Sequence, residues 1–151
     1  MRSAACLFFS AFLFAAAAAK AADMTLEARL IWGTNDEKGG PNCKPVDAEL
    51  SASLHRTFKW TNYFEITNQM AAIPEKQTRD LKMSDRCTLR IRNLGGSRVE
   101  INCIGQGKEV HKRSDTLLPH TWLVLGGNDT NNTAWFIGLR SDNGGKVISK
   151  N

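Results

Sequence analysis

The segment from Cys87 to Cys103 constrains the fold of this chain most, because apolar and polar residues alternate on both sides of a Gly-Gly pair. The apolar members all have odd numbers: Leu89, Ile91, Val99 and Ile101. Side chains of a strand point alternately to its two faces, so this pattern is typical of two half-buried strands. The segment therefore predicts a β-hairpin with one buried apolar face.

The register of this hairpin follows from the same alternation. If the apolar residues share one face, opposed positions must have numbers with an even sum, and we expect Leu89 to lie opposite Ile101. The next pair is then Ile91 with Val99, and a three-residue loop places Gly96 in the left-handed conformation. A two-residue loop at the Gly-Gly pair would turn one apolar face outward, which a buried face forbids.

This register places Cys87 directly opposite Cys103. Opposed residues have Cα atoms about 4.5–5.5 Å apart, and this spacing is one that a disulfide tolerates. Loss of a leader that contains Cys6 would leave three cysteines, so at least one would lack a partner within the chain. Three alternatives stay open: a Cys87–Cys103 bridge, a bridge that uses Cys43, or free thiols that pack as small hydrophobic residues.

The outer face of the hairpin and the residue before it are rich in arginine. The candidate anion-binding residues are Arg86, Arg90, Arg92 and Arg98. The expected register sets Glu100 opposite Arg90 and leaves two arginines facing each other, which costs a few tenths of a kcal/mol. Guanidinium groups match carboxylate and phosphate, so this face could bind an anionic polysaccharide, a lipid headgroup or an acidic protein. The alternative is a solvated sheet face whose arginines pair with nearby acids.

Six further segments have strand-like patterns: 24–32, 58–67, 78–84, 108–113, 122–125 and 134–139. We expect 108–113, with its lysines, to be an edge strand and the last two to form a central pair. Asp47 can cap one short helix over residues 47–55, in which Leu50 and Leu54 share a face. About eight closely spaced strands without a βαβ rhythm predict an all-β fold, an antiparallel β-sandwich or a partly open barrel.

The first residues resemble a secretory leader. Arg2 precedes an apolar run over residues 7–19, and Ala19-Lys20-Ala21 fits the small-x-small cleavage rule. The run is shorter than the roughly 20 residues that a membrane span needs, although an uncleaved anchor is the alternative. We expect a signal peptide at 1–21, one β-sandwich domain at 22–141, a flexible polar tail at 142–151, and a periplasmic or extracellular location.

Charge and motif content favour binding over catalysis. Removal of Arg2 and Lys20 lowers the formal net charge from +5 to +3, a small excess that does not suggest a nucleic-acid partner. No Gly-x-Ser-x-Gly motif is present, and His55, His111 and His120 lack the spacing of metal ligands. We therefore expect no catalytic residue, no metal and no cofactor, with an unrecognised small hydrolase as the alternative.

Aromatic side chains offer a second candidate binding surface. Trp60 and Tyr63 lie near the expected start of a strand, where exposed rings can stack on a sugar. The alternative is that these rings pack in the core, as aromatic residues of strands commonly do.

Several segments resemble a family of small exported bacterial proteins of unknown function. The segments are 32–35, 58–66, 93–100, 123–129 and 133–140. This resemblance spans most of the chain after the leader and implies a bacterial, exported protein, but it supplies no activity. We expect a non-enzymatic binding or scaffolding domain, with a carbohydrate-binding module and a subunit of an envelope assembly as alternatives.

Overall fold

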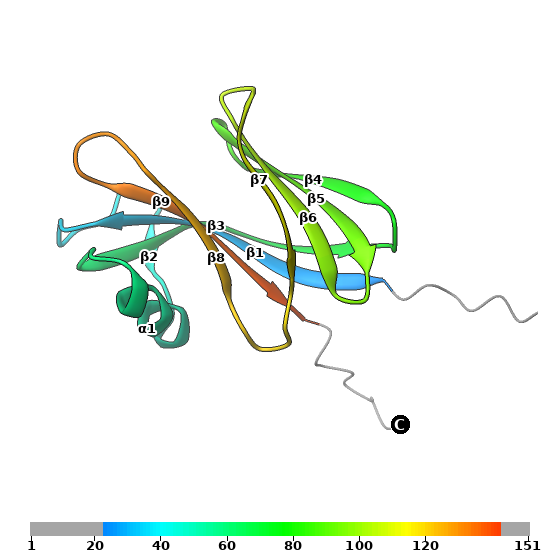
Figure 1. Cartoon of the computed structure of the whole chain (residues 1–151). Coiled ribbons are helices and arrows are strands. Elements are labelled where there is room, and N and C mark those ends of the chain that lie inside the picture. Colours follow the sequence, from blue (N-terminus) through cyan, green and yellow to red (C-terminus); the bar gives the residue numbers. More distant parts are fainter. Residues whose placement is uncertain (1–22, 143–151) are drawn as a thin grey trace, which may run out of the picture.

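The computed structural model describes residues 23–142 (Figure 1). The expected leader at 1–21 and all of the expected tail except Asp142 lie outside these residues. The elements are β1 Met24–Thr34, β2 Lys44–Pro45, α1 Ala48–Thr57, β3 Asn62–Ile73, β4 Thr78–Ser84, β5 Cys87–Gly95, β6 Arg98–Gly105, β7 Lys108–Thr116, β8 Leu123–Asn128 and β9 Ala134–Ser141.

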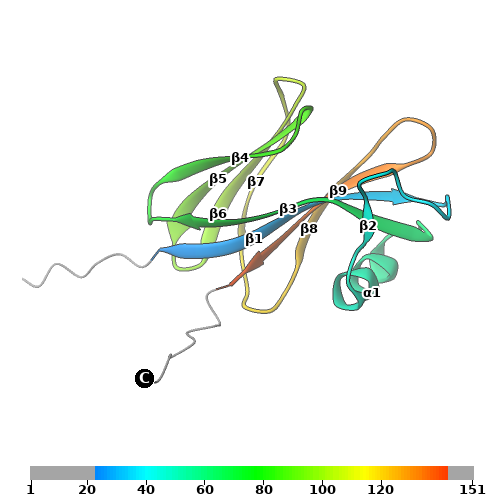
Figure 2. The same ribbon diagram turned by 180° about the vertical axis from the view of Figure 1, so that it is seen from behind.

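The strands form two antiparallel sheets, so the predicted β-sandwich is confirmed. Sheet A has the order β2-β3-β1-β9-β8, and sheet B has the order β4-β5-β6-β7. The chain passes from sheet A to sheet B at the turn after β3, as Figure 2 shows. Among residues 23–142 no helix is long and apolar enough to cross a membrane.

The inter-sheet core follows from the alternation seen in the sequence. Leu26 and Ala28 of β1 face Leu89, Ile91 and their neighbours of sheet B, and all four side chains are fully buried. Each large apolar side chain moved from water into such a core stabilises the fold by about 1.5–3 kcal/mol. The predicted buried face of the hairpin is therefore confirmed.

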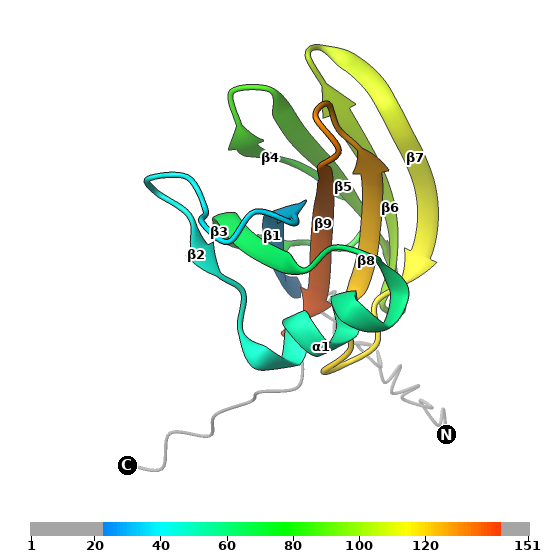
Figure 3. The same ribbon diagram turned by 90° about the vertical axis from the view of Figure 1, so that its left-hand side faces the viewer.

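A second core lies on the other face of sheet A, between the sheet and α1 (Figure 3). The predicted cap is confirmed, because the Asp47 carboxylate accepts a hydrogen bond from the backbone N–H of Leu50 at 3.0 Å. The predicted helix face is confirmed too, since Leu50 and Leu54 are fully buried. Phe58 and Trp60 belong to the loop after the helix, so the strand expected from residue 58 begins only at Asn62.

The hairpin register differs from the expected one by two residues. Leu89 lies opposite Cys103, and Ile91 lies opposite Ile101. Both registers keep the odd-numbered residues on one face, so hydrophobic alternation alone does not distinguish them. Gly96 has a positive φ as expected, but Gly95 and Ser97 have one as well, and the turn is built differently.

The two sheets are joined more closely along one side than along the other. On the β3–β4 side, Thr67 Oγ1 donates to the Met83 carbonyl at 2.7 Å, and Gln69 Nε2 donates to the Lys82 carbonyl at 2.6 Å. On the opposite side, β7 is an edge strand as predicted, and nearly all its side chains are exposed on both faces. The expected central position of the last two strands holds for β9 alone, because β8 is an edge strand.

Candidate functional site

The main candidate site is an open cleft between the two sheets, with a volume of about 730 Å³. It lies where the second half of β1 and the first half of β3 face the β4–β5 and β6–β7 turns of sheet B. Residues at the β6–β7 turn and at the start of the β8–β9 loop also line it, and both connections are seen in Figure 1. We call this space the inter-sheet cleft.

Two tryptophans form the sheet A wall of the inter-sheet cleft. Trp32 of β1 and Trp135 of β9 lie opposite each other on adjacent strands, and both are partly exposed. Gly127 of β8 lies opposite Trp135, and a Cβ atom there would come within 2.6 Å of the Trp135 ring. The glycine thus allows the indole to lie across β8 beside the cleft. Ile66 and Val110, both exposed, extend the apolar lining.

Two cations stand on the sheet B side of the cleft. Arg86 belongs to the β4–β5 turn, and Lys108 begins β7. A hydrogen bond of 2.9 Å from the Gln106 N–H to the Arg86 carbonyl joins the two turns. Neither cation forms an ion pair with another residue of 23–142, whereas Asp129 supplies the one carboxylate of the lining. The polar lining therefore favours an anionic group.

The cysteines of the hairpin also line the cleft, as free thiols. Cys87 lies opposite Gly105, so it is diagonal to Cys103 and not opposite it as expected. The expected Cys87–Cys103 bridge and the alternative bridge through Cys43 are both wrong for this structure, because all three cysteines of residues 23–142 are unbridged. Burial raises the pKa of both hairpin thiols, and for Cys103, with Cys87 nearby, it reaches about 11.

A thiol that stays protonated at neutral pH is a poor nucleophile and a poor metal ligand. The residues at 23–142 also contain no cluster of three or more histidine, cysteine or acidic side chains that could hold a metal ion. The chemistry that the cleft offers is thus apolar contact combined with attraction of an anion.

The arginine-rich face is less available for anions than the sequence indicates. Arg90 forms two hydrogen bonds of 2.8 Å with the Asp80 carboxylate on β4. Arg92 lies opposite Glu100, so the expected Arg92–Arg98 pair and the expected Arg90–Glu100 pair are wrong, for the same reason as the register. Arg86 lies at the cleft and is separated from the other three.

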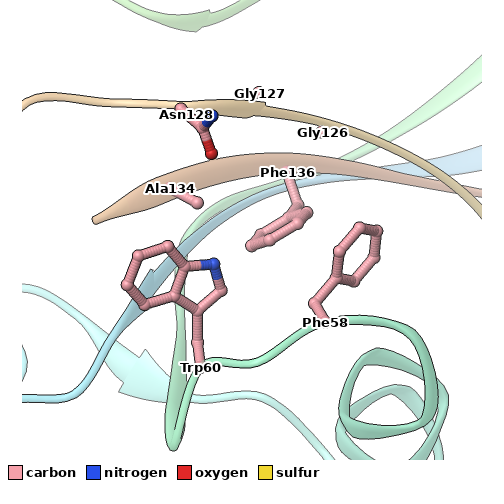
Figure 4. A pocket seen from close by; sticks show the side chains of 7 residues that line it. All are labelled: Phe58, Trp60, Gly126, Gly127, Asn128, Ala134 and Phe136. Atoms are coloured by element: carbon pink, nitrogen blue, oxygen red, sulfur yellow. The ribbon is translucent and has the colours of Figure 1, made fainter. Parts of the chain in front are cut away.

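The stacking candidates are core residues in this structure. Trp60 and Tyr63 are each only 4% exposed, so the prediction of an exposed stacking platform at these two rings is wrong. Tyr63 packs edge-on against His55 and Phe136. Trp60 and Phe58 line a smaller pocket of about 200 Å³ beside β8 (Figure 4).

A buried charge network lies on the helix side of sheet A, and the sequence pattern does not predict it. Arg29 pairs with Glu27 at 2.7 Å and with Glu65 at 3.3 Å, and Arg140 pairs with Glu27 at 2.8 Å. The two guanidinium groups also lie over the Trp122 ring, at 4.8 and 4.5 Å. Burial would raise the pKa of Glu27, but hydrogen bonds from Arg29, Arg140 and Asn68 lower it below its ordinary value.

The sequence carries only part of the signal for this network. Alternation in β1 places Glu27 and Arg29 on one face, but their partners lie on β3 and β9, which are far away along the chain. The acids and cations satisfy one another, so we assign this network to the fold and not to a ligand.

Comparison with known proteins adds no relative. No protein-family model, no curated protein and no solved structure matches this chain. The resemblance to a family of small exported bacterial proteins therefore stays a prediction, and the functional proposal rests on the geometry of the cleft.

Proposed function

We propose that this chain is a non-catalytic binding protein whose inter-sheet cleft holds an amphipathic molecule with an apolar body and one anionic group. The observation that carries the proposal is the combination of apolar walls with Arg86 and Lys108 in one cleft of about 730 Å³. Ligand sites of small molecules commonly have volumes of about 300–1,000 Å³ and mostly apolar linings with few polar groups.

The apolar wall accounts for affinity and the cations for selectivity. A ligand that buries about 200 Å² of apolar surface against Trp32 and Trp135 gains about 5 kcal/mol before the costs of association. An anionic head at Arg86 and Lys108 adds charge-assisted contacts that a cationic head of equal length cannot make. The ligand class is therefore set by charge as well as by chain length.

Binding is favoured over hydrolysis by the groups that line the cleft. A general acid–base pair needs two titratable groups within reach of one reacting atom, and the lining has a single carboxylate, Asp129. The two thiols are held protonated by burial. The sequence of residues 1–21, which resembles a secretory leader, supports an exported protein. For such a protein we propose an anionic lipid or another anionic amphiphile of the envelope as the ligand.

The proposal is tested by tryptophan fluorescence during titration with dodecanoate and, separately, with dodecyltrimethylammonium. We expect saturable binding of dodecanoate and binding of the cationic amphiphile that is at least about tenfold weaker, a ratio that corresponds to 1.4 kcal/mol. Arg86→Ala/Lys108→Ala should lower the dodecanoate affinity by a similar factor.

The matched control is Arg92→Ala/Arg98→Ala, which removes the same charge from the outer face of sheet B. This variant should bind dodecanoate as the wild type does. Equal losses in the two double variants, or no saturable binding of either amphiphile, would overturn the proposal.

A further inference from the structure

Edge strand β8 offers an unpaired backbone. Its hydrogen-bonded neighbour is β9, and in the order of sheet A no strand lies beyond it among the residues that the structure describes. The backbone hydrogen bonds outside the strand ladders include none that reaches the strand from Leu123 to Asn128. One side of β8 therefore has N–H and C=O groups available for another strand.

The other long edge strands carry the features that discourage such pairing, and β8 does not. β7 contains Lys108, Lys112 and Arg113, and β4 contains Arg79 and Lys82. The sequence of β8 is Leu-Val-Leu-Gly-Gly-Asn, without a charge or a proline. Charged side chains, prolines and very short strands normally protect a sheet edge, so β8 is the long edge that is open to pairing.

A pocket lies beside this edge, on the side of sheet A that carries α1. Phe58, Trp60 and Phe136 form its apolar wall, and Gly126, Gly127 and Asn128 of β8 form its border (Figure 4). A Cβ atom on Gly126 would lie 2.6 Å from the Phe136 ring, so this ring position requires glycine. The same glycine leaves the β8 backbone exposed at the pocket.

We propose that the free edge of β8 binds an extended peptide segment of a partner protein, with one apolar side chain of that segment in the pocket of Phe58, Trp60 and Phe136. Main-chain hydrogen bonds along an open edge supply affinity, and pockets for alternate side chains supply specificity. This site lies on the opposite face of sheet A from the inter-sheet cleft and uses the outer edge of β8, although Gly127 and Asn128 border both spaces.

The chemistry of the pocket border specifies the peptide further. Exposed Lys59 lies between the pocket residues Phe58 and Trp60 in the chain, and its ammonium is 4.9 Å from the centre of the Trp60 ring, so a positive charge lies beside the pocket wall. An acidic residue beside the apolar anchor complements it. A second copy of the chain fits less well, since its own β8 carries no acidic residue to complement Lys59.

The test starts with selection of random octapeptides on the immobilised protein, followed by titration of the best fluorescein-labelled peptide. We expect enrichment of an aromatic or branched apolar residue next to an acid, and slower hydrogen exchange of β8 amides when the peptide is bound. Val124→Lys, which puts a charge on β8, should weaken binding at least about tenfold. Lys59→Glu should shift the selected flank from acidic to basic.

The control is Val110→Lys on the β7 edge, where the side chain is 55% exposed. Because Val124 is partly buried against the helix-side core, thermal unfolding must first show that both variants fold as the wild type does. It should leave peptide affinity within about twofold of the wild type. The proposal is overturned if selection enriches no apolar anchor, or if Val124→Lys and Val110→Lys weaken binding equally. It is also overturned if the free protein is a dimer in sedimentation with β8 already protected, because the second copy is then the occupant.

Discussion

Cys87 and Cys103 lie diagonally across β5 and β6, with Leu89 opposite Cys103 and Gly105 opposite Cys87. Both thiols face the same side, and both line the inter-sheet cleft. The arrangement keeps them protonated, since burial raises the pKa of each. Their role in this structure is packing.

The Cys103 thiol should make stability fall at high pH. Its pKa rises from an ordinary value of 9.0 to about 11 in the folded chain, so between these values only the unfolded chain ionises. Stability is full below pH 9 and is lost as the pH rises toward 11, by roughly 2–3 kcal/mol at most. The measurement is the free energy of unfolding in urea for the wild type and Cys103→Ala as the pH rises from 9 to 11. We expect the wild type to lose more stability over this range than the variant. Equal losses would contradict the prediction.

Loss of Glu27 should destabilise the fold strongly. Glu27→Ala removes the carboxylate that Arg29 and Arg140 share, but Arg29 keeps Glu65 and Asp47, and Arg140 keeps Glu49. We therefore expect a loss of about 1.5–3 kcal/mol, below the cost of a buried charge left without any partner. Because hydrogen bonds lower the pKa of Glu27 below its ordinary value, its stabilisation is present above pH 4.5 and is lost as the pH falls through the folded pKa. Thermal unfolding at pH 7 and at pH 3 should therefore separate the variant from the wild type more at pH 7.

The control for Glu27 is Glu37, an exposed acid of the loop after β1. Glu37→Ala should change the melting temperature little at either pH. Similar effects of the two substitutions would mean that the buried network contributes no more than general surface charge.

Asp47 should contribute measurably to the stability of the fold through the cap of α1. Asp47→Ala removes the acceptor of the Leu50 N–H and a partner of Arg29, and caps of this kind are worth about 0.5–2 kcal/mol. Asp47→Asn keeps the side-chain acceptor and should recover most of the loss. Urea unfolding curves of the two variants, compared with the wild type, separate the hydrogen bond from the charge.

The outer face of sheet B should bind anionic polymers only weakly. Arg90 is already paired with Asp80, and Arg92 lies opposite Glu100. We therefore expect Arg90→Ala/Arg92→Ala/Arg98→Ala to elute from a heparin-type column at a salt concentration close to that of the wild type. Much earlier elution of this variant would instead make the hairpin face a working anion surface, because phosphate-type contacts are strongly salt-dependent.

In this protein the sequence predicts which face of a strand is buried better than it predicts which residues of neighbouring strands lie opposite each other. Alternation identifies Leu89 and Ile101 as buried, but a shift of two residues preserves every face, and the actual turn has positive φ at Gly95, Gly96 and Ser97. The position of β8 at the edge is equally hidden, because its apolar residues resemble those of an interior strand. These features depend on contacts between distant segments, which no local pattern specifies.

The candidate site, too, could be predicted from the sequence only in part. Arg86 is recognisable as a cation from the sequence, yet its separation from Arg90 depends on where the β4–β5 turn meets the β6–β7 turn. The tryptophans of the cleft come from strands that are about a hundred residues apart, so their pairing appears only in the folded chain.

The unequal closure of the two sheets has a mechanical consequence. Hydrogen bonds from Thr67 and Gln69 hold β3 to β4, whereas the strands on the opposite side, β7 and β8, are both edges. The two sheets are thus joined by hydrogen bonds along the β3–β4 side, whereas the connection on the opposite side is the chain from β7 to β8, which forms a bridge to β9 between Pro119 and Ser141. We therefore expect the distance between Trp32 and the turns of sheet B to vary with the size of the bound ligand while every strand pair stays intact.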